Sequence, residues 1–321
     1  MTPYKVEKEF KPGVDRLVNI ADGTTVTVKR LGCEAIGYDV YDPQHQKLLP
    51  LLWNNNNDGL PFEGAWKNHA TLLFPIVGGL RNNRSRTLDG TEILLAGNHG
   101  FARKSMFVPV SESTDDCARI TYRLTDSAET RAVYPYVFLL ELTYTLKGNA
   151  LSLEFQVRNT DKKPLFCQFG WHPGISTEFG LGGKRTEWQI HFPEGAYRQY
   201  HVLDTGDSFL TGKTSERRFR GPVTYSDHEL HCTVMYEIDE PANRRCRFYN
   251  PRLKRGVEVV FPDLPHVGLW ANANQEYICI EPWQGMDDHN QQEPFDKKVG
   301  ILRLEPGETV LRSATIIPIL G

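Results

Sequence analysis

The sequence lacks the excess of positive charge that is typical of proteins that bind nucleic acids. Its 321 residues contain 37 lysines and arginines against 40 aspartates and glutamates, which gives a formal net charge of -3 at pH 7. It also lacks a basic tail or block. Because clustered positive charge is what displaces counterions from phosphates, we expect no nucleic acid partner.

Long apolar runs are missing as well. Apolar segments such as 48–53 and 137–140 are far shorter than the roughly 20 residues that a helix needs to cross a bilayer. Residues 1–8 are mostly charged or polar and lack the continuous apolar stretch of a secretory signal. The sequence therefore predicts a cytoplasmic protein without a membrane partner.

Metal-binding spacings are absent from the cysteines and histidines. The six cysteines form no C-x-x-C pair, which argues against a zinc ribbon or a redox motif, and no H-x-H spacing occurs. We expect buried reduced thiols and no metal site. His228 and His231 form H-x-x-H, but residues three apart on a strand face opposite sides, so a solvated segment is expected there. Residues 287–289 are expected to form an exposed loop.

Helical periodicity is weak along the whole chain, whereas strand periodicity is clear. The 27 glycines and 20 prolines interrupt the sequence often, and no run of 12 or more residues combines 3.6-residue spacing with caps. Residues 119–124 alternate strictly, and 138–146 and 151–157 alternate on either side of a turn at 147–149. The second pair of segments predicts a long hairpin.

Further strands are predicted toward the C-terminus. Residues 245–250 and 257–261 alternate around a basic loop, and 301–304 and 315–319 flank a Pro-Gly turn. We interpret each of these as a strand pair. The asparagine run at 54–57 is expected to be a loop. Together these patterns predict an all-β fold, in which residues 1–321 form one large antiparallel β-sandwich domain.

Glu281 is the most informative polar residue, because it directly follows a strand-like apolar segment at 277–280. A carboxylate at the end of a buried strand must be paired, hydrogen-bonded or functional. Partial burial raises a carboxyl pKa toward neutrality, which suits general-base catalysis. The residue types alone support equally well a carboxylate that caps a loop.

Two histidines occupy short loops of the predicted fold. His172 lies between Trp171 and Pro173, which predicts a rigid turn, and an imidazole titrates near neutrality as a proton donor must. His99 is followed four residues later by Arg103, whose guanidinium suits a phosphate or a carboxylate. For both histidines the alternative is a structural side chain that satisfies its neighbours.

Five short motifs, taken in order, identify a resemblance. They are residues 73–78 (LFPIVG), 99–103 (HGFAR), 134–136 (YPY), 170–173 (GWHP) and 280–283 (IEPW). With them the chain resembles the aldose 1-epimerase (galactose mutarotase-like) family, in particular the branch of the lactose-operon X protein. The resemblance implies a single-domain β-supersandwich that interconverts the α and β anomers of a hexose or hexose phosphate without a cofactor.

The resemblance also implies catalytic roles. Glu281 would be the base that removes the proton from the C1 hydroxyl, and His172 the acid that protonates the ring oxygen. His99 would be a second polar group that holds the ring oxygen or a neighbouring hydroxyl. Proton relay between two side chains opens the ring to an aldehyde, and reclosure gives the other anomer.

Substrate contacts are implied for five residues. Arg103 and an arginine of the loop that holds Arg81 and Arg84 would bind the sugar or a sugar phosphate, and Trp283 or Trp171 would form an apolar wall. The partner is thus a small molecule, and the chain is expected to be a monomer or a homodimer.

The sequence departs from the family at three places. Gly79 stands where the family usually carries an arginine, Gly174 stands where it tends to carry an aromatic residue, and residues 228–236 hold no clear counterpart of its substrate-binding aspartate. These departures keep a second hypothesis open, a carbohydrate-binding or sensing protein without catalysis. A glycoside hydrolase is the third, although it needs two carboxylates at the scissile bond and the motifs supply one.

Overall fold

Antiparallel strands form most of the structure, as the alternating side chains predict. The computed structural model describes residues 3–53, 65–179, 181–203 and 208–321. Every pair of named strands in it is antiparallel. The asparagine run at 54–57 lies outside the described residues. The all-β, antiparallel fold class is therefore confirmed.

Two large sheets carry the core. The eight-stranded sheet has the order β15-β19-β20-β24-β12-β11-β10-β9, with strands β9 (Val108–Ser113), β10 (Ala118–Thr125), β11 (Phe138–Lys147), β12 (Ala150–Asn159), β15 (Gln189–His191), β19 (Arg245–Asn250), β20 (Arg255–Val260) and β24 (Thr309–Leu320). The seven-stranded sheet has the order β17-β16-β18-β21-β22-β14-β6, with strands β6 (Ala70–Leu73), β14 (Phe169–Ser176), β16 (Gly195–Val202), β17 (Leu210–Phe219), β18 (Val234–Glu237), β21 (His266–Trp270) and β22 (Tyr277–Gln284).

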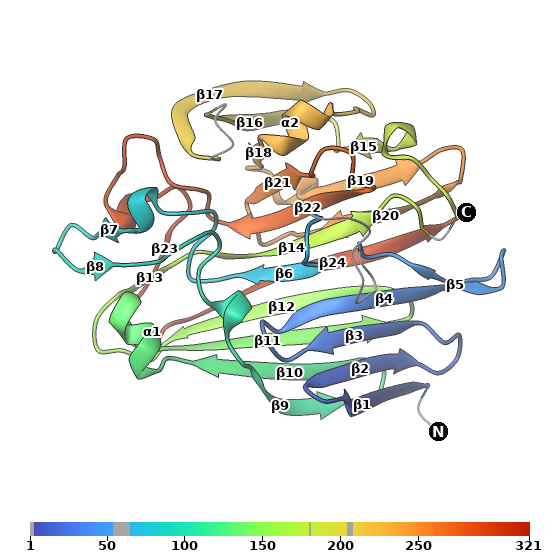
Figure 1. The fold of residues 1–321 in the computed structure, drawn as a ribbon, viewed down its shortest axis with the longest axis horizontal. Coiled ribbons are helices and arrows are strands. Elements are labelled where there is room, and N and C mark those ends of the chain that lie inside the picture. Colours follow the sequence, from blue (N-terminus) through green and yellow to red (C-terminus); the bar gives the residue numbers. More distant parts are fainter. Residues whose placement is uncertain (1–2, 54–64, 180, 204–207) are drawn as a thin grey trace.

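Smaller sheets complete the fold. The N-terminal sheet runs in sequence order through β1 (Tyr4–Lys11), β2 (Val14–Asn19), β3 (Thr25–Lys29), β4 (Glu34–Asp42) and β5 (Lys47–Pro50). Two-stranded sheets join β7 (Ser85–Arg86) with β8 (Glu92–Ile93) and β13 (Leu165–Cys167) with β23 (Leu302–Leu304). In Figure 1 the N-terminal strands lie at the lower side and β16, β17 and β18 at the upper side.

Helices are short wherever the chain is described. The α-helices are α1 (Ala128–Val133) and α2 (Asp227–His231), and the 3-10 turns are η1 (Arg81–Asn83), η2 (Ala102–Lys104), η3 (Arg185–Glu187), η4 (Pro241–Asn243) and η5 (Phe295–Lys297). Ser127 and Ser226 cap the two α-helices by accepting from a backbone N–H three residues on. In this described part of the chain, no helix has the length and apolar character needed to cross a membrane.

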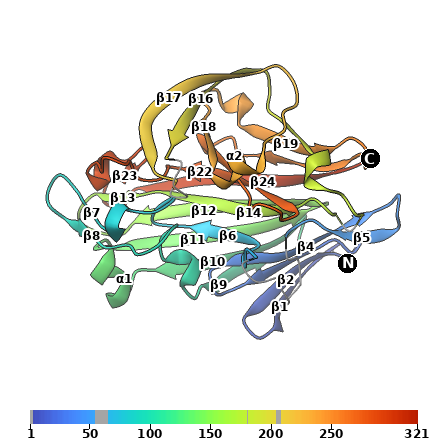
Figure 2. The same cartoon turned by 45° about the horizontal axis from the view of Figure 1, so that its top comes forward.

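Aromatic and polar side chains join the sheets to one another. Phe155 of β12 stacks on Phe169 of β14 with ring centroids 5.3 Å apart, so the two large sheets pack face to face. The N-terminal sheet packs on β10 and β11, where the Tyr122 hydroxyl donates to Asp15 at 2.9 Å. Figure 2 shows this sheet beside β9 and β10. One buried hydrophobic cluster contains residues from Leu17 to Ile316.

Two of the predicted strand pairs are confirmed and one is wrong. The β11–β12 hairpin runs from Phe138 opposite Asn159 to the turn at 148–149, and β19 pairs with β20. The C-terminal segments 301–304 and 315–319 do not pair with each other, since β23 pairs with β13 and β24 lies between β12 and β20. Alternation identifies a strand but not its partner. The turn between β23 and β24 is held by the Asn159 side chain, which donates to the Leu304 carbonyl at 2.8 Å.

His266 gives a stability prediction, because burial lowers its pKa from 6.5 to about 4. Its Nδ1 accepts from the Gly285 N–H at 3.2 Å, which fixes the neutral form. Above pH 6.5 the ring is neutral in both states, and as pH falls toward 4 only the unfolded chain takes up the proton. We expect this single group to lower the free energy of unfolding by about 2 kcal/mol between about pH 7.5 and about pH 5.

Urea unfolding of the wild type and of His266→Gln at both pH values measures this contribution. The glutamine oxygen can still accept from Gly285 but does not titrate. Between the two pH values the free energy of unfolding should therefore fall by about 2 kcal/mol less in the variant than in the wild type. Equal losses in the two proteins would show that His266 is not the group that takes up the proton.

Candidate active site

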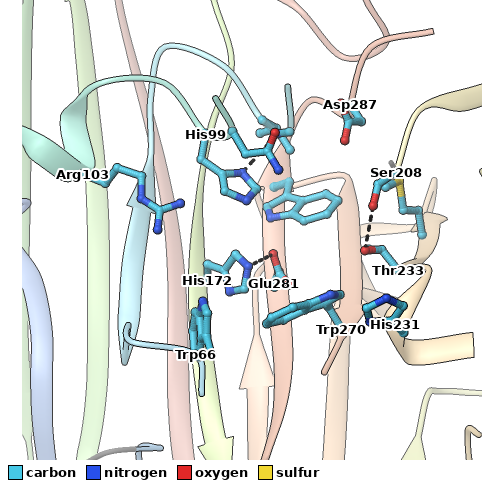
Figure 3. Close-up of a pocket in the computed structure, with 15 residues that line it drawn as sticks. Trp66, His99, Arg103, His172, Ser208, His231, Thr233, Trp270, Glu281 and Asp287 are labelled. Carbon is cyan, nitrogen blue, oxygen red and sulfur yellow. Dashed lines mark hydrogen bonds and ion pairs between the residues drawn. The ribbon is translucent and has the colours of Figure 1, made fainter. Parts of the chain in front are cut away.

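Two neighbouring strands of the seven-stranded sheet place the main candidate residues side by side. His172 of β14 and Glu281 of β22 occupy facing positions, since Gly170 pairs with Trp283 and Gly174 with Cys279. The His172 Nε2 and Glu281 Oε2 atoms are 3.2 Å apart, with both side chains buried. The sheet itself therefore fixes an imidazole against a carboxyl group (Figure 3).

The local structure around both residues differs from the prediction. His172 was expected in a turn and Glu281 at a strand end, but β14 runs through to Ser176 and β22 through to Gln284. All eight residues of each strand are buried. A strand that is covered on both faces shows no alternation, and the glycines and prolines within these segments resemble turn signals.

His99 joins the pair from a loop. Its backbone has a φ of 68°, its N–H donates to the Gly78 carbonyl at 2.6 Å, and its Nδ1 accepts from the Gly78 N–H at 3.1 Å. Because Nδ1 accepts, the neutral ring carries its proton on Nε2 and can donate from there. The His99 ring meets that of His172 edge to face, with centroids 5.3 Å apart.

Arg103 supplies the positive charge of the site. It belongs to the 3-10 turn η2 and lines the same pocket as His99, His172 and Glu281. With its amide oxygen turned toward the guanidinium, Asn68 accepts from Arg103 at 2.8 Å. The turn thus holds a guanidinium close to the carboxyl group and the two imidazoles.

Burial dominates the protonation of the site. It raises the pKa of Glu281 well above its ordinary value, and the charge of Arg103 acts in the opposite direction. Burial, with a smaller contribution from the charge of Arg103, lowers the pKa of His99 to about 3. Burial also lowers the pKa of His172 well below 6.5, and His99 and Arg103 act in the same direction. The ligand-free pocket therefore favours a protonated Glu281 beside neutral histidines.

Three tryptophans form the apolar part of the pocket. Trp66 stacks on His172 with centroids 5.0 Å apart and an interplanar angle of 28°, and Trp270 meets both rings edge-on at 5.7 Å. Trp283 lies between two glycines, since a Cβ at Gly170 or Gly268 would lie within 2.6 Å of its ring. These rings provide the flat apolar faces on which sugar rings commonly pack.

The departure at Gly174 has a structural explanation. A Cβ at this position would lie 2.6 Å from the Trp66 ring, so Trp66 leaves no room for a side chain here. We expect Gly174→Ala to push Trp66 off His172 and to cost about 1–3 kcal/mol of stability, as overpacking does. Urea unfolding and tryptophan fluorescence measure both effects.

Gly221→Ala is the matched control for this prediction, because nothing lies within 4 Å of the Cβ that it adds. The idea of a tightly packed Trp66 fails if the two alanine variants unfold alike and the fluorescence of Gly174→Ala is that of the wild type.

Several polar atoms of the pocket have no hydrogen bond within the described residues. They are Nδ1 of His172, both carboxyl oxygens of Glu281 and the indole nitrogen of Trp283, all of them buried. Glu281 still contacts His172, and the Trp283 side chain lowers its pKa, although neither contact has good hydrogen-bonding geometry. Because buried polar groups are normally well paired, these atoms suit hydrogen bonds to a polar ligand.

The pocket has a volume of about 310 Å³, near the lower end for small-molecule sites. Besides His99, Arg103, His172, Glu281 and Trp283, it is lined by residues that the sequence analysis did not propose as contacts. These are Trp66, Val77, Gly78, Asn98, Ser208, His231, Thr233, Met235, Trp270 and Asp287. They come from separate loops and strands, so no motif in the sequence connects them. The only signal in the sequence is that some of them are polar or aromatic residues.

Two expectations about these residues need correction. Residues 287–289 were expected to be an exposed loop, but Asp287 and Asp288 are buried. Asp288 contacts the ammonium group of the equally buried Lys298 at 3.4 Å. The two residues are ten positions apart, and no local sequence pattern indicates that they pair in the interior. The H-x-x-H segment is exposed, as expected, but forms helix α2, which brings His231 to the pocket.

Three proposed substrate contacts lie outside the pocket. Arg81 and Arg84 are exposed at the ends of η1, where the Arg81 N–H donates to Asp288 at 3.0 Å. Trp171 precedes His172 on β14 and so points to the opposite face, where its indole N–H donates to the Ala70 carbonyl at 3.2 Å. Arg103 is the one arginine that lines the pocket among the described residues.

One group of side chains has metal-like spacing. Donor atoms of His172, Cys279 and Glu281 lie within 4.8 Å of one another. Burial raises the pKa of the Cys279 thiol well above its ordinary value, and metals bind the thiolate. A metal ion bound by this group would therefore have to displace the thiol proton. All six cysteines are free, and Cys232 alone among them is not buried.

The antiparallel sheets form a galactose mutarotase-like fold, as comparison with solved structures shows. The Aldose 1-epimerase family matches residues 16–315. The chain therefore belongs to the aldose 1-epimerase family. This confirms the resemblance that the five motifs indicate.

Individual proteins of known sequence or structure are also similar to this chain. The chromosomal protein LacX of Lactococcus lactis subsp. lactis is 26% identical over 285 residues, which cover 84% of this chain and 89% of LacX. A galactose mutarotase related enzyme from Lactobacillus acidophilus superposes with a TM-score of 0.81 at 26% identity, over 92% of this chain and 95% of that one. A galactose mutarotase-like protein from Lactobacillus casei gives 0.78 at 18% identity, over 98% and 99% of the chains, and supports the fold.

Proposed function

We propose that the protein is an aldose 1-epimerase that interconverts the α and β anomers of a hexose by acid–base opening of the ring. The observation that carries this proposal is the buried contact of His172 with Glu281, both of which line the pocket. Anomer exchange needs one group that takes a proton and one that gives a proton, held on the same substrate.

The pair supplies both roles from a single proton. Glu281 gives its proton to His172, whose Nε2 lies 3.2 Å from Oε2, when the two groups align into a hydrogen bond, and this leaves a carboxylate base and an imidazolium acid. The carboxylate then takes the proton of the C1 hydroxyl while the imidazolium protonates the ring oxygen, and the bond between C1 and the ring oxygen breaks. The aldehyde rotates about C1–C2 and closes by the reverse transfers. Proton count and charge balance at each step.

His99 and Arg103 support these transfers. The neutral His99 ring presents Nε2–H as a donor for the ring oxygen or a neighbouring hydroxyl, since Gly78 occupies its Nδ1. The Arg103 charge lowers the pKa of Glu281 and so favours the carboxylate. Every group in this scheme is a side chain of the protein, and no cofactor is invoked.

The substrate proposed is a hexose or hexose phosphate. A volume of about 310 Å³ suits a single sugar ring, and the tryptophans offer apolar walls for it. The phosphate version was based on Arg81, Arg84 and Arg103, of which only Arg103 lines the pocket. The pocket therefore favours the free sugar over the phosphate.

Anomer exchange by NMR magnetisation transfer tests the proposal. Glucose, galactose and glucose 6-phosphate are followed with the purified protein, and exchange above the spontaneous rate is expected on at least one of them. No added exchange on any sugar would reject the enzyme. Ligand shifts without exchange would then support the alternative of a binding or sensing protein on the same fold.

A further inference from the structure

The pocket has two chemically different sides. The His172–Glu281 contact and the tryptophans form one, and Asn98, Ser208, Thr233 and Asp287 contribute polar groups to the rest of the lining. Ser208 and Thr233 join their hydroxyls at 3.1 Å, and Asp287 lies apart from the His172–Glu281 pair (Figure 3). A sugar that reacts at Glu281 has further hydroxyls that need partners away from its C1.

Asp287 is held in one orientation by backbone groups. Its Oδ1 accepts from the N–H of Gly79 and from that of Asp288, both at 2.8 Å. Its carboxyl group packs so closely on Gly78 that a Cβ there, at a φ of 65°, would lie 2.2–2.5 Å from the carboxyl atoms. The two glycines of this turn therefore create the space for the carboxyl group.

The second oxygen of Asp287 differs from the first. Across the described residues no hydrogen bond uses Oδ2, and the carboxyl group faces the pocket. Below it, Lys298 and Asp288 form a buried pair at 3.4 Å that supports the same segment. A carboxylate oxygen fixed in this way is a preorganised acceptor, and hydroxyl donors bind such charged acceptors more strongly than neutral ones.

We propose that Asp287 is a specificity-determining residue that accepts a hydrogen bond from a sugar hydroxyl remote from C1. This proposal rests on the proposed function, because it places the reacting end of the sugar at Glu281. The carboxyl group comes from the turn after β22, and the N–H groups of Gly79 and Asp288 anchor it.

A series of deoxy sugars crossed with Asp287→Asn tests the proposal. Exchange kinetics are measured on glucose and on its 2-, 3-, 4- and 6-deoxy forms. For the wild type, one deoxy sugar should have a KM at least about tenfold above that of glucose. Asp287→Asn should raise the KM for glucose by a similar factor, with a smaller effect on kcat, and should have little effect on that one deoxy sugar. An equal effect of the substitution on every sugar would overturn the proposal.

Asp239→Asn is the matched control. It makes the same change in an exposed carboxylate that does not line the pocket, and should leave the ranking of the deoxy sugars unchanged. The measurements on the wild type need no variant, so they still test the proposal if Asp287→Asn does not fold. Similar KM values for glucose and its four deoxy forms would also overturn the proposal.

A sugar that cannot react separates this proposal from the proposed function. 1,5-Anhydroglucitol lacks the C1 hydroxyl, so its Kd reports binding alone. If the wild type shows no anomer exchange, the proposed function fails, and Asp287 is then judged by this Kd. A Kd at least about tenfold weaker in Asp287→Asn than in Asp239→Asn supports the role of Asp287, and equal values reject it.

Discussion

Replacing Glu281 by glutamine should reduce anomer exchange by about a thousandfold or more, which is the upper range for the loss of a general base. Glutamine keeps the size of the side chain but can neither take the proton of the C1 hydroxyl nor carry the proton that His172 needs. The measurement is magnetisation transfer on the best substrate, at protein concentrations where the wild type exceeds the spontaneous rate by a wide margin.

The fold should tolerate this substitution. Burial already favours the uncharged form of Glu281, and a neutral amide meets the same surroundings without a charge. We therefore expect urea unfolding at neutral pH and the Kd of 1,5-anhydroglucitol to change little. A loss in exchange of less than about tenfold would assign the base to another group, and Asp287 is the other carboxyl group in the described pocket lining.

The second large effect is expected for His172→Asn, with a loss in kcat of about a hundredfold to a thousandfold. Asparagine removes the group that takes the Glu281 proton and protonates the ring oxygen. Binding should weaken only modestly, because Arg103, His99 and the tryptophans remain. Exchange kinetics that separate kcat from KM measure this difference.

His231→Asn provides the comparison for this variant. His231 also lines the pocket but comes from the exposed helix α2 and contacts neither Glu281 nor His172 by any interaction found among the described residues. Its replacement should leave kcat within about twofold to threefold of the wild type. Similar losses in both variants would mean that the histidines act through general electrostatics rather than through proton transfer at His172.

The sequence predicts much of the site but little of its surroundings. The motifs identify His99, Arg103, His172, Glu281 and Trp283, and the fold brings all five to one pocket. Their order along the chain is enough for this, because related folds place equivalent strands together. What each residue does chemically stays a prediction until its variants are measured.

Other features of the site depend on long-range packing that no local pattern records. Trp66 reaches His172 only because Gly174 leaves room for its ring, and these two residues are more than a hundred positions apart from each other in the chain. Asp287 appeared exposed in the sequence because its neighbours are polar. Its burial depends on Gly78, Gly79 and Lys298, which meet it only in the folded chain.

The extents of two strands were missed for a related reason, namely that β14 was predicted as a turn and β22 as ending at residue 280. Alternation identified β10, β11, β12 and β19, each of which has one wetter face. Strands β14 and β22 are covered on both faces, so burial imposes no period of two on them. The catalytic candidates thus lie in the part of the sheet where sequence patterns carry the least information about structure.

The direct contact between His172 and Glu281 has a consequence for how the reaction responds to its medium. In the proposed mechanism the pair passes one proton between its two members and the sugar, so the pocket neither gains nor loses charge during a turnover. Spontaneous mutarotation in water depends on dissolved acids and bases to carry protons. The protein would instead act as a closed relay, so its rate per molecule should be insensitive to the buffer concentration that accelerates the uncatalysed background.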